Sequence, residues 1–345
     1  MKKLITLISC MIIATNLFCF GQNEIVKNKI VNRFPVEGDG GWDYLKIDDT
    51  TGRLFVSHGM VTQVVDSKTG TLLGTIENTK GVHGIAFDPK GNKAFISCGR
   101  DSSVTVINLT TLQFITNVKV TGANPDAILY DPFSDKVFVY NGRSSNATVI
   151  DANTNTVVAT IPLAGKPEFS ATDGNGKVYV NIEDKSLITV IDSKNLKVEN
   201  TWSIAPGEEP SGLALDNTTH RLFSVCSNKK MVVMDAQNGK IISTLEIGDG
   251  SDGCAFDPQL KRAYSSNGEG TLTVVQEEGA NKFYVLETLQ TEKGARTIGI
   301  DHKTHHLFLP TAKFGPAPEA TAANQHPRPA IQPGTFTILD IAPIK

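Results

Sequence analysis

The chain has 345 residues, of which 40% are hydrophobic and 20% are charged, and its formal net charge at neutral pH is −3. This composition is typical of a folded globular protein and excludes a collagen-like, coiled-coil or intrinsically disordered chain. The small acidic excess gives no electrostatic basis for binding nucleic acid, so we expect no nucleic-acid partner.

Residues 1–21 have the layout of a secretory signal peptide. Two lysines precede a mostly apolar run over residues 4–20, and small Gly21 stands before polar Gln22. We therefore expect cleavage near Gly21 and a periplasmic or secreted protein whose mature chain does not span a membrane. A membrane anchor is the alternative, but the apolar run, about 17 residues long, is at the lower limit of spanning length.

A short phrase that ends in aspartate recurs along the rest of the chain. The seven copies read DYLKID (43–48), HGIAFD (83–88), DAILYD (126–131), EFSATD (168–173), SGLALD (211–216), DGCAFD (252–257) and RTIGID (296–301). Successive copies lie 40–44 residues apart, which is the period of a β-propeller blade. Turn-forming residues follow each copy, so we expect each final aspartate to cap backbone groups of a turn.

In the first six units three more short runs follow the phrase, for example KVFVYNG, ATVID and VVATIPL in the third unit. Their β-branched residues and the turn signals between them predict strands. The sequence thus predicts an all-β fold, a seven-bladed β-propeller with four-stranded antiparallel blades, as a single domain over residues 22–345. The last unit lacks a fourth run, whereas IVKNKIVNRFPV (25–36) has no unit of its own. We expect this N-terminal strand to complete the last blade and remove its open edge.

The first residue of each phrase marks a candidate binding site. These residues enter the innermost strand of each blade, at the face where the channel opens. They are Asp43, His83, Asp126, Glu168, Ser211, Asp252 and Arg296. Six of the seven are ionisable, so we expect an acidic mouth that binds a small polar ligand, a metal ion or a protein segment. The alternative is that these side chains are only solvated or bonded to neighbouring loops.

Three of the carboxylates are the expected metal ligands: Asp126, Glu168 and Asp252 would hold a divalent cation such as calcium. His83 would then act as a general base, because imidazole titrates near neutral pH. Besides a binding module, a metal-dependent lactonase or lyase-like enzyme and a protein-interaction scaffold are therefore alternative functions. The motifs GxSxG, HExxH, CxxCH and the P-loop are absent, which argues against serine-hydrolase, zincin, haem and nucleotide chemistry.

The last unit carries an insertion. The ends of the third runs lie 41–43 residues apart in the first six units, but the final interval is 64 residues. The excess falls in the Pro- and Ala-rich segment 310–335, on the face of the mouth, and is either a lid or a floppy excursion. As a lid it would carry Lys313, Arg328 and a further candidate ligand-binding residue, His326. Trp42, beside the mouth, would either wall a pocket or pack in the core.

A family resemblance is found in two stretches of the chain. They read KVFVYNGRSSNATVIDANTNTVVATIPLAGKPE (136–168) and KVYVNIEDKSLITVIDSKNLKV (177–198). Their Y/F-V strand, V-I-D strand and N-T-V-type turn resemble the YVTN-repeat β-propeller family, in its YncE-like extracytoplasmic branch. The resemblance covers nearly the whole mature chain and implies a periplasmic or secreted propeller. Related propellers include lactonases and a streptogramin lyase, but the resemblance implies no catalytic residue here. We expect a monomer.

Overall fold

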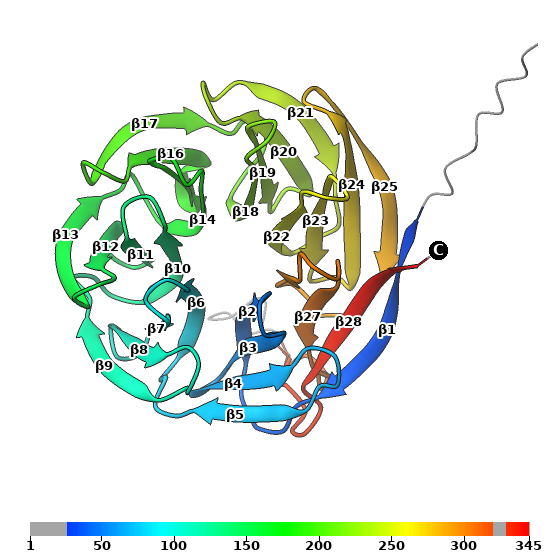
Figure 1. Cartoon of the computed structure of the whole chain (residues 1–345). Helices are drawn as coiled ribbons and strands as arrows, with labels where there is room; N and C mark the ends of the chain where they lie inside the picture. Colours follow the sequence, from blue (N-terminus) through cyan, green and yellow to red (C-terminus); the bar gives the residue numbers. More distant parts are fainter. Residues whose placement is uncertain (1–25, 320–328, 345) are drawn as a thin grey trace, which may run out of the picture.

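The computed structural model describes residues 26–319 and 329–344, which form seven four-stranded antiparallel sheets arranged in a ring (Figure 1). The seven-bladed β-propeller predicted from the repeats is therefore confirmed. Within the described residues, no helix is long and apolar enough to cross a membrane. The expected signal peptide, residues 1–21, lies outside the described residues.

The strands of each blade follow one another from the channel outward. Blade 1 consists, from its innermost to its outermost strand, of β2 (Trp42–Asp48), β3 (Arg53–His58), β4 (Val61–Asp66) and β5 (Leu72–Ile76). In the same order, blade 2 consists of β6 (Val82–Asp88), β7 (Lys93–Cys98), β8 (Ser103–Asn108) and β9 (Phe114–Lys119). Blade 3 consists of β10 (Pro125–Asp131), β11 (Lys136–Asn141), β12 (Asn146–Asp151) and β13 (Thr156–Pro162). Blade 4 consists of β14 (Pro167–Thr172), β15 (Lys177–Ile182), β16 (Leu187–Asp192) and β17 (Lys197–Ser203), with the short 3₁₀ helix η1 (Glu183–Lys185) between β15 and β16.

Blade 5 consists of β18 (Pro210–Asp216), β19 (Arg221–Cys226), β20 (Lys230–Asp235) and β21 (Ile241–Glu246). Blade 6 consists of β22 (Ser251–Asp257), β23 (Arg262–Asn267), β24 (Thr271–Gly279) and β25 (Lys282–Gln290). Blade 7 consists of β26 (Gly299–Ile300), β27 (Leu307–Thr311), β28 (Thr337–Ile344) and β1 (Lys27–Pro35), so its outermost strand comes from the other end of the chain.

The N-terminal strand closes the ring, as the sequence predicts. β1 pairs with β28 in the antiparallel direction along nearly its whole length. The backbone and side-chain nitrogens of Asn28 donate hydrogen bonds of 2.7 and 2.6 Å to Glu287 of β25. The side-chain amide of Asn32 donates to Asp340 of β28 at 2.7 Å. β1 thus covers the edge of blade 7 and also ties it to blade 6, so the ring has no open strand edge there.

The aspartates that end the repeated phrase cap turns on the face opposite the mouth. The carboxylate of Asp88 accepts a hydrogen bond from the backbone N–H of Gly91 at 2.8 Å. One carboxylate oxygen of Asp257 accepts from the N–H groups of Gln259 and Leu260, both at 2.9 Å. Each such carboxylate holds a tight turn between the first and second strands, which is why the repeat requires it.

Removing β1 tests this closure. A protein that begins at Gly38 exposes the edge of β28 and loses the buried side chain of Phe34 from the hydrophobic cluster between blades 7 and 1. We expect it to be poorly soluble or to lose several kcal/mol of unfolding free energy, roughly the worth of the apolar burial and pairing. Asn28→Ala, which keeps the strand, should cost only about 1–3 kcal/mol. A truncated protein that melts like the full chain would show that β1 does not close the ring.

The outer strands of successive blades fit together at glycines with positive φ. Gly239, in the turn between β20 and β21, has φ +75°, and a Cβ atom there would overlap the ring of Trp202 in β17. Gly70 has φ +71° and contacts Phe34 of β1 in the same way. Only glycine combines this backbone conformation with such a close contact.

Substitution of one such glycine should weaken the seam between two blades. Gly239→Ala adds left-handed strain and overpacks Trp202, so we expect a loss of about 1–3 kcal/mol in unfolding free energy. Gly279→Ala is the matched control, because it also lies beside an outer hairpin and a Cβ there meets no heavy atom within 4 Å. Chemical denaturation of both variants measures the difference, and equal stabilities would contradict this account of the seam.

Candidate functional site at the channel mouth

In blades 1 to 6, a β-bulge at the start of the innermost strand sets the direction of the mouth residue. In blade 1, Trp42 pairs with His58 but Leu45 pairs with Val56, so two residues, Asp43 and its neighbour, stand opposite one. Blades 2 to 6 show the same register shift at the same place. A bulge bends its strand and turns a side chain out of the regular alternation. Here the side chain so turned belongs to the position that the sequence singles out as the candidate site.

The bulges leave backbone groups free, and side chains of neighbouring strands bind them. The N–H of Asp43 donates to Ser57 Oγ at 3.0 Å, and that hydroxyl donates onward to the carbonyl of Tyr44 at 2.8 Å. Between blades, Thr297 donates to the carbonyl of Asp43 at 2.6 Å and Ser266 donates to the carbonyl of Arg296 at 2.5 Å. The backbone of the mouth is therefore fixed by hydroxyl groups and does not depend on its charged side chains.

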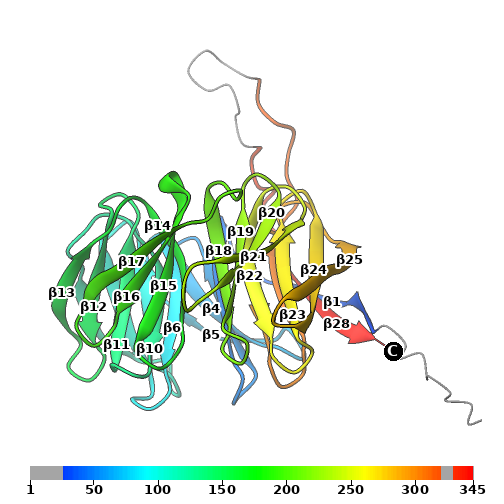
Figure 2. The same cartoon turned by 90° about the horizontal axis from the view of Figure 1, so that it is seen from above.

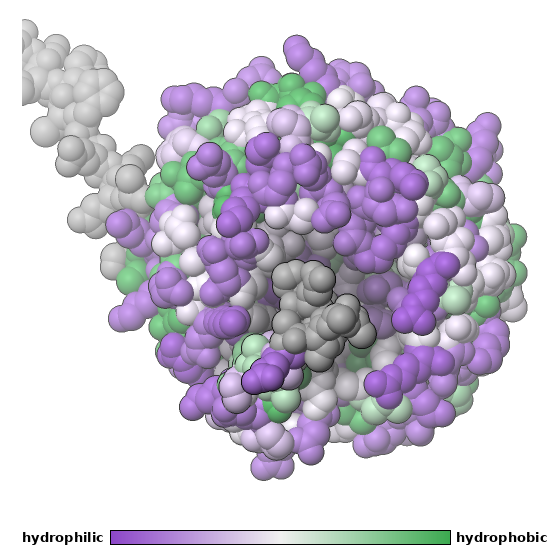
Figure 3. Space-filling view, turned by 180° about the vertical axis from the view of Figure 1, so that it is seen from behind, coloured by the Kyte–Doolittle hydropathy of each residue, from purple (hydrophilic) through white to green (hydrophobic). Residues whose placement is uncertain are grey.

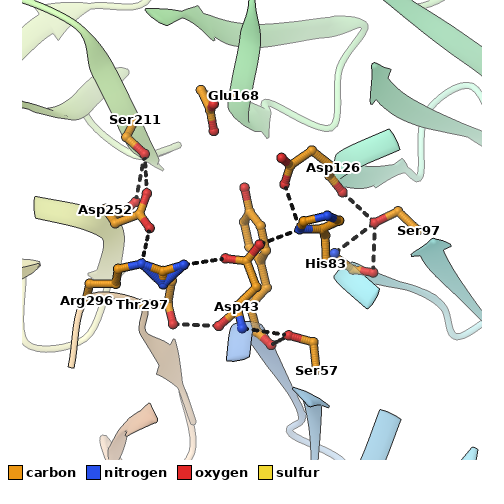
Figure 4. A network of polar contacts seen from close by, with 12 residues as sticks. Asp43, Ser57, His83, Ser97, Asp126, Glu168, Ser211, Asp252, Arg296 and Thr297 are labelled. Carbon is orange, nitrogen blue, oxygen red and sulfur yellow. Dashed lines mark hydrogen bonds and ion pairs between the residues drawn. The ribbon is translucent and has the colours of Figure 1, made fainter. Parts of the chain in front are cut away.

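Five mouth residues from blades 6, 7, 1, 2 and 3 form one chain of ionic contacts (Figure 4). The Nδ1 atom of His83 lies 2.6 Å from a carboxylate oxygen of Asp43 and 3.6 Å from one of Asp126. Arg296 lies 3.6 Å from the other oxygen of Asp43, and its Nε lies 3.1 Å from Asp252. Asp252 also accepts a hydrogen bond of 2.6 Å from Ser211 of the preceding blade. The seven predicted residues thus do converge around the channel axis.

Glu168, from blade 4, completes the ring but has a different partner. Its carboxylate lies 2.8 Å from the ammonium group of Lys166, which also contacts Glu183. Glu168 points toward the centre of the mouth in Figure 4, and only 8% of its surface is exposed. Lys166, which lies in the loop before β14, is not among the residues predicted from the sequence. Lys166 stands two residues before Glu168. Because side chains alternate along an extended chain, residues two apart point the same way, and this spacing could have indicated the pair.

Burial and mutual repulsion perturb the acids of the mouth. Burial, with the neighbouring charge of Asp43, raises the pKa of Asp126 to about 6. Burial, with the charge of Asp126, raises the pKa of Glu168 to about 8 even though Lys166 opposes the shift. Burial disfavours the imidazolium form of His83, but its bond to Asp43 and the nearby charge of Asp126 outweigh that effect, so its pKa is raised. Asp126, Glu168 and His83 therefore bind protons more tightly than free side chains do, and the cationic groups of the mouth do not fully balance its carboxylates.

An aromatic pair lies close to the mouth. The rings of Tyr44 and Phe169 lie 4.3 Å apart between centroids, and Tyr44 from blade 1 packs against the hydrophobic cluster of blades 3 and 4. Burial, and the charges of Asp126 and Glu168, raise the pKa of Tyr44. Both rings line a channel cavity of about 300 Å³. Tyr44 could have been singled out from the sequence. Blades 2 and 3 have the small residues Gly84 and Ala127 at the equivalent position, so a large aromatic residue there departs from the repeat.

The structure groups a different metal-binding set from the one expected. Among the described residues, the single group of three that could share an ion is Asp43, His83 and Asp126, whose ligand atoms lie within 4.8 Å of one another. The expected set of Asp126, Glu168 and Asp252 is not brought together in this way. The reason is pairing, since Asp252 is held by Arg296 and Ser211, whereas Glu168 is held by Lys166.

The insertion in blade 7 rises from the face of the mouth. Its described parts, 312–319 and 329–336, leave the ring between β27 and β28 (Figure 2), and hydrophilic residues surround a central hollow on this face (Figure 3). Lys313 is exposed in its stem, while His326 and Arg328 lie outside the described residues. Trp42 meets both expectations for it, because it packs against the cluster of blades 7 and 1 and lines a cavity.

Comparisons with known proteins agree with the fold. No protein-family model matches the chain, and no curated protein matches it. Hydrazine synthase of Kuenenia stuttgartiensis is similar with a TM-score of 0.68 and 18% identity, covering 79% of this chain and 94% of that chain. A chain of a mitotic checkpoint complex is similar with a TM-score of 0.72 and 11% identity, covering 89% of this chain and 96% of that chain. At these identities the likeness shows the propeller fold alone.

The raised pKa values predict how stability depends on pH. Glu168 has a folded-state pKa of about 8 against 4.5 for the free side chain, so at intermediate pH the folded protein binds a proton that the unfolded chain lacks. Stability must then fall as pH rises through this window, and the raised pKa values of Asp126 and His83 act in the same direction. We expect the melting temperature to be higher at pH 6 than at pH 8.5.

Glu168→Gln should reduce this pH dependence and raise the melting temperature at pH 8.5, because it removes a buried charge that the mouth tolerates poorly. Glu278→Gln, on an exposed outer hairpin, is the control and should keep the wild-type profile. Circular dichroism melts between pH 5 and 9 measure both. A Glu168→Gln profile with the wild-type slope would show that this carboxylate does not titrate in the window.

Proposed function

We propose that this protein is an extracytoplasmic binding module whose channel mouth takes a small polar ligand that carries positive charge. The proposal rests on one observation. Four buried or half-buried carboxylates face one axis, and within the ring only one guanidinium and one imidazole are present to balance their negative charge. Burial raises the pKa values of Asp126 and Glu168, and the neighbouring carboxylates raise them further, so protons bind where a cation would also be favoured. A cationic ligand would replace these protons.

The arrangement suits binding because it is fixed in advance. In blade 1 the mouth side chain leaves from a bulge whose backbone is held by Ser57 and Thr297, and Ser266 holds the carbonyl of Arg296, so little ordering is needed when a ligand arrives. Like charges held together cost stability, and proteins tolerate such a cost at functional sites. The extracytoplasmic location rests on the signal-like residues 1–21 and on the resemblance to YncE-like members of the YVTN-repeat family.

A metal-dependent lactonase or lyase-like activity is the second candidate, and the group of Asp43, His83 and Asp126 is the observation that favours it. Imidazole among the ligands suits zinc or manganese better than calcium, which prefers oxygen ligands alone. Without a metal, Asp43 would instead orient the imidazole of His83 as a general base. In the scaffold alternative, changes in the mouth would leave partner binding unaffected.

The variant Asp126→Asn distinguishes a role of this carboxylate in ligand binding from a role in stabilising the fold. Because the folded-state pKa of Asp126 is about 6, its charge is present at pH 7.5 at a cost to stability, so we expect this variant to melt at a higher temperature than the wild type. The same change should weaken the binding of methylammonium, measured by calorimetry, by about tenfold. Asp249→Asn removes an exposed carboxylate on the same face, away from the ring, and should change neither property.

Binding of manganese or zinc with turnover of a simple lactone, lost on His83→Ala, would favour the enzyme over the binding module. Absence of binding of any cation, with equal melting temperatures for wild type and Asp126→Asn, would contradict both functions.

A further inference from the structure

A second cavity opens beside the ring, under the insertion of blade 7. It has a volume of about 480 Å³ and is mainly apolar. Trp42, Phe314, Ile331 and Pro329 supply its apolar lining, and four glycines contribute backbone to the wall. Arg296 lines this cavity and also contacts Asp43 and Asp252 of the ring, so the cavity and the mouth share a side chain. We call this cavity the annex.

The apolar wall of the annex is held in place by the stem of the insertion. Phe314 forms a bridge with Ile331, and the stem is closed by hydrogen bonds of 2.8 Å from Gly315 to the carbonyl of Ala330 and from Gln332 to that of Lys313. These bonds give the two described arms of the insertion a hairpin-like pairing. An apolar surface is therefore presented beside a charged ring.

The two aromatic side chains of the annex, Trp42 and Phe314, lie against each other at a tilted angle. The rings of Trp42 and Phe314 lie 6.0 Å apart between centroids. A Cβ at Gly294, which has φ +89°, would come within 2.7 Å of Phe314, so the wall there is backbone alone. The indole N–H of Trp42 is buried with no acceptor among the described residues. Glycine at this position lets Phe314 pack directly against the backbone of the wall.

The charges of the annex orient a ligand. Lys293 and Arg296 line it, and among the described residues Lys293 makes no ion pair. Two cationic side chains oppose the entry of an ammonium group, although aromatic rings alone would attract one. The carboxylates of the ring attract the same group. A cationic head is thus directed to the ring and an apolar arm to the annex.

From this juxtaposition, and resting on the proposed function, we propose that the ligand of the mouth is an organic cation with an aromatic or bulky aliphatic arm. Its ammonium head lies among the ring carboxylates, and its arm passes Arg296 into the annex, where it packs against Trp42 and Phe314. A bare metal ion would leave the annex unused. The ligand class is therefore that of arylalkylamines and related amphipathic amines.

The two tryptophans of the chain allow a direct test. Trp202→Phe leaves Trp42 as the single tryptophan, so its fluorescence reports on the annex. Phenethylamine and methylamine are the probes, since they share the ammonium head and differ in the arm. We expect phenethylamine to bind about tenfold or more tightly than methylamine and to change Trp42 fluorescence, whereas methylamine should change it little.

Phe314→Ala should reduce phenethylamine affinity by about tenfold and leave methylamine affinity unchanged. Ile331→Ala is a second annex variant, and melting curves verify that both fold. Phe114→Ala is the matched control, because that ring is 65% exposed on the outer strand of blade 2. Equal affinities of the two amines, or annex variants with wild-type affinity for phenethylamine, would overturn this inference and leave the proposed function standing. Failure of both amines to bind would overturn both.

Discussion

The β-bulge that opens the innermost strand of blades 1 to 6 is the constraint on which the rest of the mouth depends. It turns one side chain per blade toward the axis, and it frees backbone groups that hydroxyl side chains such as Ser57 and Ser97 then bind. Because these bonds hold the backbone, the side chain at the bulge contributes little to the blade itself. Evolution can therefore change that residue without changing the fold. Asp43, His83, Asp126 and Glu168 occupy equivalent positions in successive blades for this reason.

This freedom has an electrostatic consequence. Carboxylates from different blades meet in a buried place, so burial first and then mutual repulsion raise the pKa values of Asp126 and Glu168. The neighbouring pairs do not remove the excess, because Arg296 is divided between Asp43 and Asp252. Such residues do not stabilise a blade, because their buried charges repel one another. At this site, the buried carboxylates lower the stability of the fold, which is a cost that proteins accept at functional sites.

The sequence was sufficient for the fold because the fold is repeated. Seven copies of one phrase, each ending in a turn-capping aspartate, indicated the blades, and the unassigned segment 25–36 indicated the closing strand. The ring positions followed from the same period. Their pairings did not, since the period places Asp126, Glu168 and Asp252 on one circle but says nothing of which neighbour each side chain reaches. Lys166 decides the partner of Glu168, and it comes from a loop that the repeat does not describe.

The departures from the repeat lie together, and this asymmetry explains why the mouth has an annex on one side. β26 has only two residues, Gly299–Ile300, so the chain before it is not paired in the sheet as the other innermost strands are. That unpaired chain supplies Lys293, Gly294 and Arg296 to the annex. Blade 7 also carries the insertion that brings Phe314 against Trp42 of blade 1. A seven-fold ring of identical blades would offer a ligand only charge around an axis. The shortened strand and the insertion add shape and apolar surface on one side of the mouth, and in the proposed function these features would distinguish one organic cation from another.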